Sequence, residues 1–254
     1  MRNITAIAQR EINAYFTSPI GYVLVGFFAL LFGYFFYASL YAFQEASMQA
    51  GMNPTQVLNI NQYLITPTLM NTTVIMLFLF PLLTMRTYSE EKRSGTIELL
   101  LTSPVTDLEI IFGKFIGAMA IYVAMLAVSL LHIGVLFVFG EPELKPLLTG
   151  YLGLLLLGGS LISLGLFISS LTKNQIVAAM ATFAVFLILW VISWIAQSFG
   201  PTTQAVLQYL SIIEHLDDFT KGIIDTKHVV YYLSFMAFGL FLTAKSVDSE
   251  RWRG

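Results

Sequence analysis

Residues 176–199 read IVAAMATFAVFLILWVISWIAQSF, an apolar run without a single charged side chain. A run of about 20 apolar residues is long enough to cross the hydrocarbon core of a bilayer as one helix. A helix satisfies its backbone hydrogen bonds internally, whereas the strands of a membrane barrel would alternate apolar and polar residues, and this run does not alternate. The stretch therefore predicts a membrane-spanning α-helix and an all-α fold.

The rest of the chain repeats this pattern. Of its 254 residues, 57% are hydrophobic and only 11% are charged, whereas a soluble domain carries roughly 25% charged residues. Further apolar runs predict spans at residues 21–43, 65–85, 115–139, 147–171 and 229–244, the last of them short. The first run exceeds the ~7–15 apolar residues of a signal peptide, so we expect it to remain in the protein. We predict one polytopic domain over residues 1–254 with six transmembrane helices.

The basic residues orient these spans. With the N-terminus inside, ten lysines and arginines fall on the cytoplasmic side and three on the other, namely Arg2, Arg10, Arg86, Lys92, Arg93, Lys114, Lys173, Lys245, Arg251 and Arg253 against Lys145, Lys221 and Lys227. Cytoplasmic loops carry such an excess, so both termini are predicted to be cytoplasmic. The net charge of −2 does not favour nucleic-acid binding, and the absence of cysteine excludes disulfides and thiolate metal sites.

Residues 1–19 predict an amphipathic helix on the inner membrane surface. Its apolar residues recur at helical spacing, namely Ile4, Ile7, Ala8, Ile12, Tyr15 and Phe16. Glu11 falls within this face, where a carboxylate is costly unless it is paired. Either the side chain reaches sideways to water, or it forms a buried ion pair with a base beyond the second span, such as Arg86 or Lys92.

The only long charged run lies between the second and third spans, where residues 90–104 read EEKRSGTIELLLTSP. Gly95 or Thr96 can begin a short helix, and Pro104 ends it because the residue before proline disfavours the helical conformation. Thr106 and Glu109 then have the spacing of a capping box at the start of the third span. An ordinary solvated loop has no need of the apolar cluster at residues 97–101, which favours a surface that contacts another protein.

On the other side of the membrane, residues 200–228 predict one or two short interfacial or re-entrant helices, with Gly222 able to end one of them. The alternative is a surface loop with an amphipathic turn. Three histidines at positions 132, 215 and 228 have no metal-binding spacing. Several acidic residues could attract a cation, but nothing in the sequence shows that they converge, so no metal site is predicted.

Three segments carry a resemblance to a known family. The block Glu90–Pro104 followed by Gly113-Lys114 resembles the coupling-helix region of ABC-2-type transporter permeases, particularly the gliding-motility-type and copper-oxidase-maturation-type permeases. The opening of the chain is similar to that family at Arg10-Glu11, Tyr15-Phe16 and Ser18-Pro19-Ile20. So is the outer segment, at His215, Phe219, Gly222-Ile223-Ile224-Asp225 and Tyr231-Tyr232.

The resemblance implies a six-helix permease subunit of a bacterial cytoplasmic membrane, with a coupling helix at residues 93–105 that docks into a separate ATPase. The docking residues would be Glu90, Glu91, Lys92, Arg93, Gly95, Thr96, Ile97, Glu98, Leu99, Leu100, Leu101 and Pro104. The chain has no phosphate-binding P-loop, because Leu108 and Phe115 stand where that motif needs glycine and Ser or Thr around Gly113-Lys114. ATP and magnesium are therefore expected on the partner, and this chain is not expected to be catalytic.

The same resemblance implies a second permease copy, in a homo- or heterodimer, and permits a periplasmic or membrane accessory subunit. One alternative function stays open, which is a mechanical or anchoring complex that acts on a periplasmic partner without moving a solute. A secondary transporter would need paired intramembrane charges and broken helices in two repeated halves, and the sequence shows neither. The few polar residues in the spans favour a lipidic or peptidic substrate over a hydrophilic ion.

Overall fold

The computed structural model describes residues 2–51, 58–102 and 104–251, with backbone alone for Leu101 and Arg251. Within these ranges every regular element is a helix and there is no strand. Six helices are long and apolar enough to cross a membrane, which confirms the predicted all-α fold. They are α2 (Pro19–Ala50), α3 (Thr66–Thr84, continuing the π-helical turn η1 at Asn61–Ile65), α6 (Asp107–Phe139), α7 (Leu144–Ser170), α8 (Gln175–Ala196) and α11 (Thr226–Arg251).

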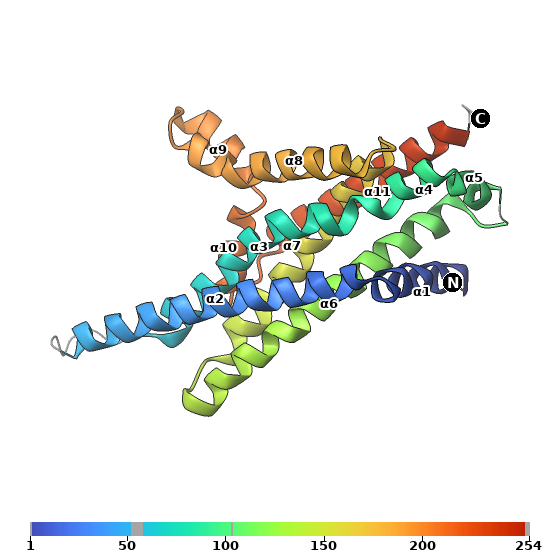
Figure 1. Ribbon diagram of the computed structural model, residues 1–254. Coiled ribbons are helices and arrows are strands. Elements are labelled where there is room, and N and C mark those ends of the chain that lie inside the picture. Colours follow the sequence, from blue (N-terminus) through green and yellow to red (C-terminus); the bar gives the residue numbers. More distant parts are fainter. Residues whose placement is uncertain (1, 52–57, 103, 252–254) are drawn as a thin grey trace.

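Five shorter helices complete the described chain, namely α1 (Arg2–Thr17), α4 (Arg86–Ser94), α5 (Thr96–Leu101), α9 (Pro201–Leu210) and α10 (Glu214–Thr220). Both termini lie at one end of the molecule together with α1, α4 and α5 (Figure 1). The C-terminal end of α2 and the connection from α6 to α7 lie at the opposite end.

Three spans are clearly longer than the hydropathy pattern predicts. The helix predicted at 21–43 runs from Pro19 to Ala50, the one predicted at 115–139 runs from Asp107 to Phe139, and the one predicted at 229–244 runs from Thr226 to Arg251. The last helix continues past its apolar part because Val247 is buried and Glu250 pairs with Lys92 of α4 at 2.6 Å. Tertiary contacts, which hydropathy does not register, extend this helix.

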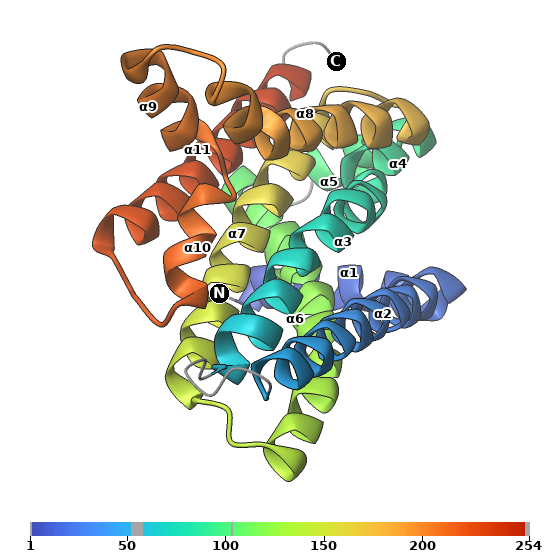
Figure 2. The same cartoon turned by 90° about the vertical axis from the view of Figure 1, so that its left-hand side faces the viewer.

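Helix α7 lies at the centre of the bundle, surrounded by α3, α6, α10 and α11 (Figure 2). Its glycines permit this position, because a Cβ at Gly158 would lie 2.2 Å from the Tyr122 ring and one at Gly165 only 2.3 Å from Thr84 Oγ1. A Cβ at Gly159 would meet Met236 Sδ of α11 at 2.6 Å. Small residues let helices approach closely in membranes, so these glycines pack α7 against three neighbours in the same chain.

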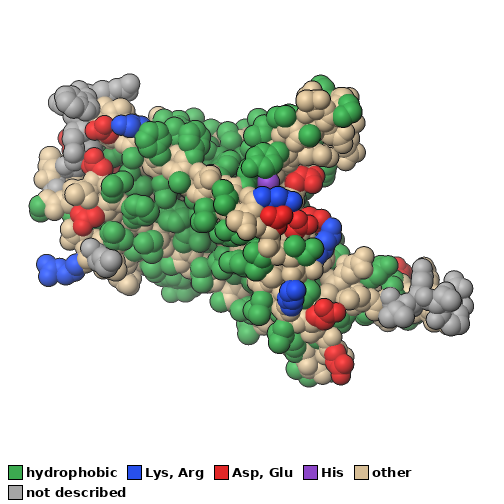
Figure 3. Space-filling model, turned by 180° about the vertical axis from the view of Figure 1, so that it is seen from behind, with side chains coloured by type: hydrophobic (Ala, Val, Ile, Leu, Met, Phe, Trp, Pro, Cys, Tyr) green, Lys and Arg blue, Asp and Glu red, His purple; other side chains and the backbone are tan. Residues whose placement is uncertain are grey.

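The surface divides into a broad apolar band and two charged ends (Figure 3). Large hydrophobic side chains are exposed along α2, α6 and α8, for example Leu30, Leu131 and Ile188. A water-soluble monomer rarely exposes so large an apolar surface. The band therefore fits the hydrocarbon core of a bilayer.

Candidate functional site

The charged run that follows α3 forms a helix of its own. Pro81 lies inside α3, and a single residue, Met85, separates α3 from α4. The first four N–H groups of a helix lack partners within it, and the start of α4 has no side-chain cap from its own segment. Ser169 of α7 supplies one, because its Oγ accepts hydrogen bonds from the backbone N–H groups of Tyr88 and Ser89, both at 3.2 Å.

The same hydroxyl also donates to the Met85 carbonyl oxygen at 2.9 Å. One buried side chain from α7 therefore serves both the end of α3 and the start of α4. Met85 itself has helical dihedral angles, so α4 continues nearly from α3, and Ser169 fixes this junction against α7.

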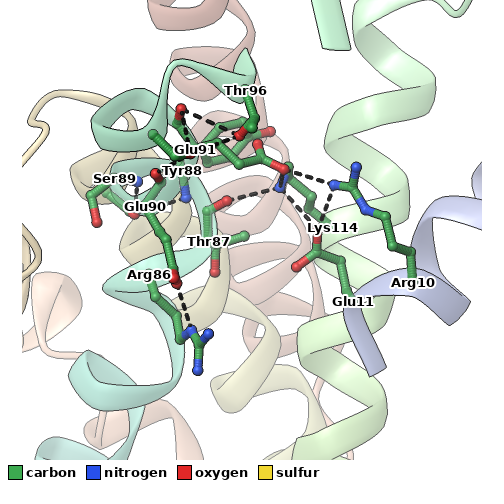
Figure 4. Close-up of polar contacts among 12 residues, drawn as sticks. Arg10, Glu11, Arg86, Thr87, Tyr88, Ser89, Glu90, Glu91, Thr96 and Lys114 are labelled. Carbon is green, nitrogen blue, oxygen red and sulfur yellow. Dashed lines mark hydrogen bonds and ion pairs between the residues drawn. The ribbon is translucent and has the colours of Figure 1, made fainter. Parts of the chain in front are cut away.

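An ion-pair network that is buried at Lys114 and half exposed at Arg10 fixes α4 against α1 and α6 (Figure 4). We call Arg10, Glu11, Glu91 and Lys114 the Lys114 network. The Lys114 Nζ lies 3.0 Å from Glu11 Oε1 and 2.9 Å from Glu91 Oε1, and it donates to the Thr87 carbonyl oxygen at 2.8 Å. Arg10 Nη2 bridges the same two carboxylate oxygens at 3.0 and 2.7 Å. Two acids and two bases thus neutralise each other across three helices.

Burial explains why this pairing is needed. The Lys114 side chain is fully buried, and its ammonium group also lies 5.0 Å from the centre of the Tyr88 ring. A buried charge without partners is strongly destabilising, whereas three acceptors match the three donors of an ammonium group. Burial alone would raise the pKa of Glu11, but the adjacent Lys114 and Arg10 outweigh it and lower that pKa.

Two glycines of α6 bring α1 close enough for this contact. A Cβ at Gly113 would lie 2.6 Å from Ile7, and a Cβ at Gly117 would lie 2.7 Å from the Cβ of Glu11. Ile7 and Ala8 are buried at this crossing. Part of the apolar face of α1 therefore packs on α6, and Lys114, directly after Gly113 and one turn before Gly117, meets Glu11 there.

Helix α5 follows α4 after a sharp change of direction at Gly95. This glycine has φ = +73°, in the left-handed region that residues with a side chain adopt only at a cost. It ends α4 and starts α5, so the helix predicted at 93–105 is confined to Thr96–Leu101. Ile97 is buried in the core of the chain, while Leu99 is 72% exposed.

The predicted capping box is present at the start of α6. The backbone N–H of Glu109 donates to Thr106 Oγ1 at 3.3 Å, and the N–H of Thr106 donates to Glu109 Oε2 at 3.0 Å. Asn3 of α1 donates to the same carboxylate at 3.1 and 3.2 Å. The corner is therefore tied to α1 as well as to α6.

Several predicted docking residues are partly or fully buried within the chain. Glu91 belongs to the Lys114 network, Lys92 is buried against Glu250, and Ile97 is a core residue. The expected ion pair between Glu11 and Arg86 is also wrong, because Glu11 pairs with Lys114 and Arg10 while Arg86 Nε pairs with Glu90 Oε2 at 3.0 Å. Lys92 and Glu11 have partners that the sequence does not indicate, because Glu250 and Lys114 approach them only in the folded chain.

The remaining predicted residues form the outer surface of this end. Exposed side chains here are Glu90, Arg93, Thr96, Glu98, Leu99 and Pro104. Leu100 is partly buried, and the side chain of Leu101 lies outside the described residues. Leu99 thus provides the main exposed apolar side chain on a helix that is otherwise polar on its outer side.

The sequence reasoning missed Lys114, Ser169 and Glu250 as members of this site. Lys114 carried one usable signal, since it stands between two glycines at the start of an apolar run. The hydroxyl of Ser169 and the carboxylate of Glu250 carry no local signal, because Ser169 reaches α4 across 80 residues and Lys92 reaches Glu250 across 158.

Comparison with known proteins identifies the family. A model described as ABC-2 family transporter protein matches residues 5–244. The chain belongs to the ABC-2 family of transporter proteins. This ABC-2 protein is accordingly a multi-pass membrane protein, and the six long apolar helices of its described residues are the candidate spans.

Curated relatives match a part of the chain. A protein named "Probable multidrug ABC transporter permease YbhR" from Escherichia coli strain K12 is 30% identical over 137 residues, and the protein of the same name from Escherichia coli O157:H7 matches equally. The aligned part covers 53% of this chain and 37% of either relative. The alignment covers well under two thirds of either relative's length. The multidrug transport in their name therefore describes those two proteins only.

Proposed function

We propose that this ABC-2 protein is the permease subunit of an ABC transporter in a bacterial cytoplasmic membrane, driven by a separate ATPase that contacts α5. The supporting observation is the combination of an exposed Leu99 on a short helix with a rigid base beneath it. The base is α4, which is tied to α1 and α6 by the Lys114 network, to α7 by Ser169 and to α11 by Lys92.

This arrangement suits the transfer of force. A displacement of α5 by a partner would reach α4 through Gly95, and α4 would carry it to four other helices at once. Buried ion pairs resist separation because each lost partner leaves an uncompensated charge. A second permease copy would present the same surface to the second ATPase of the assembly, and both termini would face the cytoplasm.

The docking proposal is tested by Leu99→Asp in the full-length protein. We expect the variant to insert in the membrane but to lose an ATPase that co-purifies with the unmodified chain, scored by mass spectrometry for a subunit with a P-loop. Leu171→Asp is the matched control, because Leu171 is 59% exposed at the end of α7 and not on α5. Equal recovery of the ATPase with both variants would contradict docking at α5.

A hydrophobic substrate fits the apolar cavity of this protein better than a hydrophilic one. A cavity of about 660 Å³ lies between α2, α3 and α8 and is lined by apolar side chains, including Phe27, Phe78 and Phe183. Hydrophobic lining favours apolar ligands, and the relatives are named as multidrug permeases.

In proteoliposomes that also contain the ATPase, Phe183→Asp should lower ATP-dependent movement of a lipophilic fluorescent dye and leave ATPase docking intact. Absence of ATP-dependent dye movement by the unmodified protein, with the ATPase docked, would favour the mechanical alternative.

A further inference from the structure

Two histidines meet at the end of the molecule opposite α5. His215 of α10 and His228 near the start of α11 lie with their Nδ1 atoms 2.6 Å apart. His215 Nε2 faces the Tyr209 carbonyl oxygen at 2.8 Å, and His228 Nε2 faces Asp218 Oδ2 at 2.8 Å. Both side chains are more than nine-tenths buried. All four ring nitrogens therefore have a polar neighbour.

These three contacts need more N–H hydrogens than two neutral imidazole rings carry. The Tyr209 carbonyl and an ionised Asp218 only accept, so each of the three contacts requires one hydrogen, whereas two neutral imidazoles carry one each. His215 uses its hydrogen on Tyr209, which makes its Nδ1 an acceptor for the N–H at Nδ1 of His228. The Nε2 lone pair of His228 is then left facing a carboxylate, and a cation between them would satisfy both.

Asp225 adds a second carboxylate at the same place. Asp218, Asp225 and His228 each offer a ligand atom, and these atoms lie within 4.8 Å of one another. Ligand atoms at about 2.0–2.2 Å from a common tetrahedral zinc ion lie about 3.3–3.6 Å from one another. Binding would therefore draw the most distant of these atoms inwards by about 1 Å and move Asp218 slightly away from His228. The carboxylate of Asp225 also lies 3.1 Å from Lys227 Nζ, but that lysine side chain is 59% exposed and free to turn towards water.

We propose that Asp218, Asp225 and His228 bind a divalent transition-metal ion of the zinc class. His215 is the positioning residue, because its acceptance of the N–H at Nδ1 of His228 directs the other nitrogen towards the ion. Metal-bound histidines characteristically donate their second N–H in this way. One imidazole and two carboxylates suit zinc better than magnesium, which prefers oxygen ligands alone, and leave a fourth position for water.

The ion would join α10 to the start of α11. Asp218 lies in α10, and Asp225 accepts the backbone N–H of Lys227 at the first turn of α11. Sequence spacing hides this site, since Asp218 and His228 are ten residues apart and belong to different helices. The turn at Gly222, with φ = +86°, brings the two helices together.

Titration of the purified full-length protein with Zn²⁺ at neutral pH, after treatment with a chelator, tests this site by calorimetry. We expect one ion per chain, with affinity at least about tenfold weaker in Asp218→Asn, Asp225→Asn and His228→Gln, and about 10–100-fold weaker in His215→Gln. Asp217→Asn is the matched control, because Asp217 pairs with Lys221 instead. Mg²⁺ should not compete.

Three results would overturn the proposal. If the unmodified protein takes up no Zn²⁺, the histidine pair is held by an extra proton alone. If Asp217→Asn weakens binding as much as Asp225→Asn, the ion is attracted by general negative charge. Should the variants fail to fold, X-ray absorption of the zinc-loaded unmodified protein decides the question, and a spectrum without imidazole ligation would refute the site.

Discussion

Lys114 shows how much a single buried charge can organise. Its ammonium group holds Glu11, Glu91 and the Thr87 carbonyl, which come from two other helices. A methionine of similar length would leave both carboxylates with Arg10 alone. We expect Lys114→Met to lower the free energy of unfolding by about 3–5 kcal/mol. Glu11→Gln should cost less, about 1–3 kcal/mol, because Glu91 still pairs with Lys114.

Thermal unfolding in detergent measures both changes, with Lys173→Met as the control because Lys173 is exposed. A double variant that carries Lys114→Met and Glu11→Gln should lose less than the sum of the single losses, since the two side chains interact directly. Additive losses, or a larger loss for Glu11→Gln than for Lys114→Met, would show that the network is not held together by Lys114.

Glu11 also predicts a response to acid. Its pKa in the folded protein is lowered from the ordinary value of 4.5, since Lys114 and Arg10 outweigh the opposing effect of burial. A carboxyl group with a lowered pKa stabilises the fold above its unfolded pKa, and this contribution is lost as pH falls through the folded value. Melting temperatures should therefore drop more steeply below about pH 4.5 in the unmodified protein than in Glu11→Gln. Glu141→Gln, at an exposed carboxylate, should leave the curve unchanged.

At the scale of elements, the junction between α3 and α4 depends on a neighbour. Replacing Ser169 by alanine removes the acceptor for the N–H groups of Tyr88 and Ser89, which should cost about 1–3 kcal/mol for buried donors left unsatisfied. Ser170→Ala is the control, because the Ser170 hydroxyl bonds to Phe167 within its own helix. Hydrogen exchange should accelerate at the start of α4 in Ser169→Ala only, and unchanged protection there would dismiss this cap.

The turn between α4 and α5 depends instead on backbone conformation. A Cβ at Gly95 would meet no atom within 4 Å, so Gly95→Ala tests the left-handed conformation alone. We expect a loss of about 1–2 kcal/mol and, under the proposed function, weaker stimulation of the ATPase. Gly26→Ala, at a helical glycine with equally open space, should not destabilise the protein and should leave ATPase stimulation unchanged. Full ATPase coupling in Gly95→Ala would mean that the angle of α5 is unimportant.

These elements also show what the sequence could and could not predict. Six spans were predictable because an apolar run of sufficient length without alternation crosses a bilayer as a helix. The Thr106–Glu109 cap was predictable because both residues lie in one turn. The helix α4 was not predicted, since its stability depends on Lys114, Ser169 and Glu250 from three other helices. Lysine side chains are rarely buried, so a buried Lys92 was not expected. Its burial follows from the ion pair with Glu250 of α11.

At the scale of the whole molecule, the two charged ends must lie on opposite sides of the membrane. The chain has no cysteine, so one introduced cysteine is a unique label. With ten of thirteen basic residues assigned to the side of α5, we expect a membrane-impermeant maleimide to label Leu99→Cys in inverted vesicles and Glu141→Cys in intact cells. Each variant is the control for the other, because both side chains are exposed, and α5, which carries Leu99, and the connection from α6 to α7, which carries Glu141, lie at opposite ends (Figure 1). The reverse pattern would place α5 outside the cell, out of reach of any cytoplasmic ATPase, and the proposed function would fail with it.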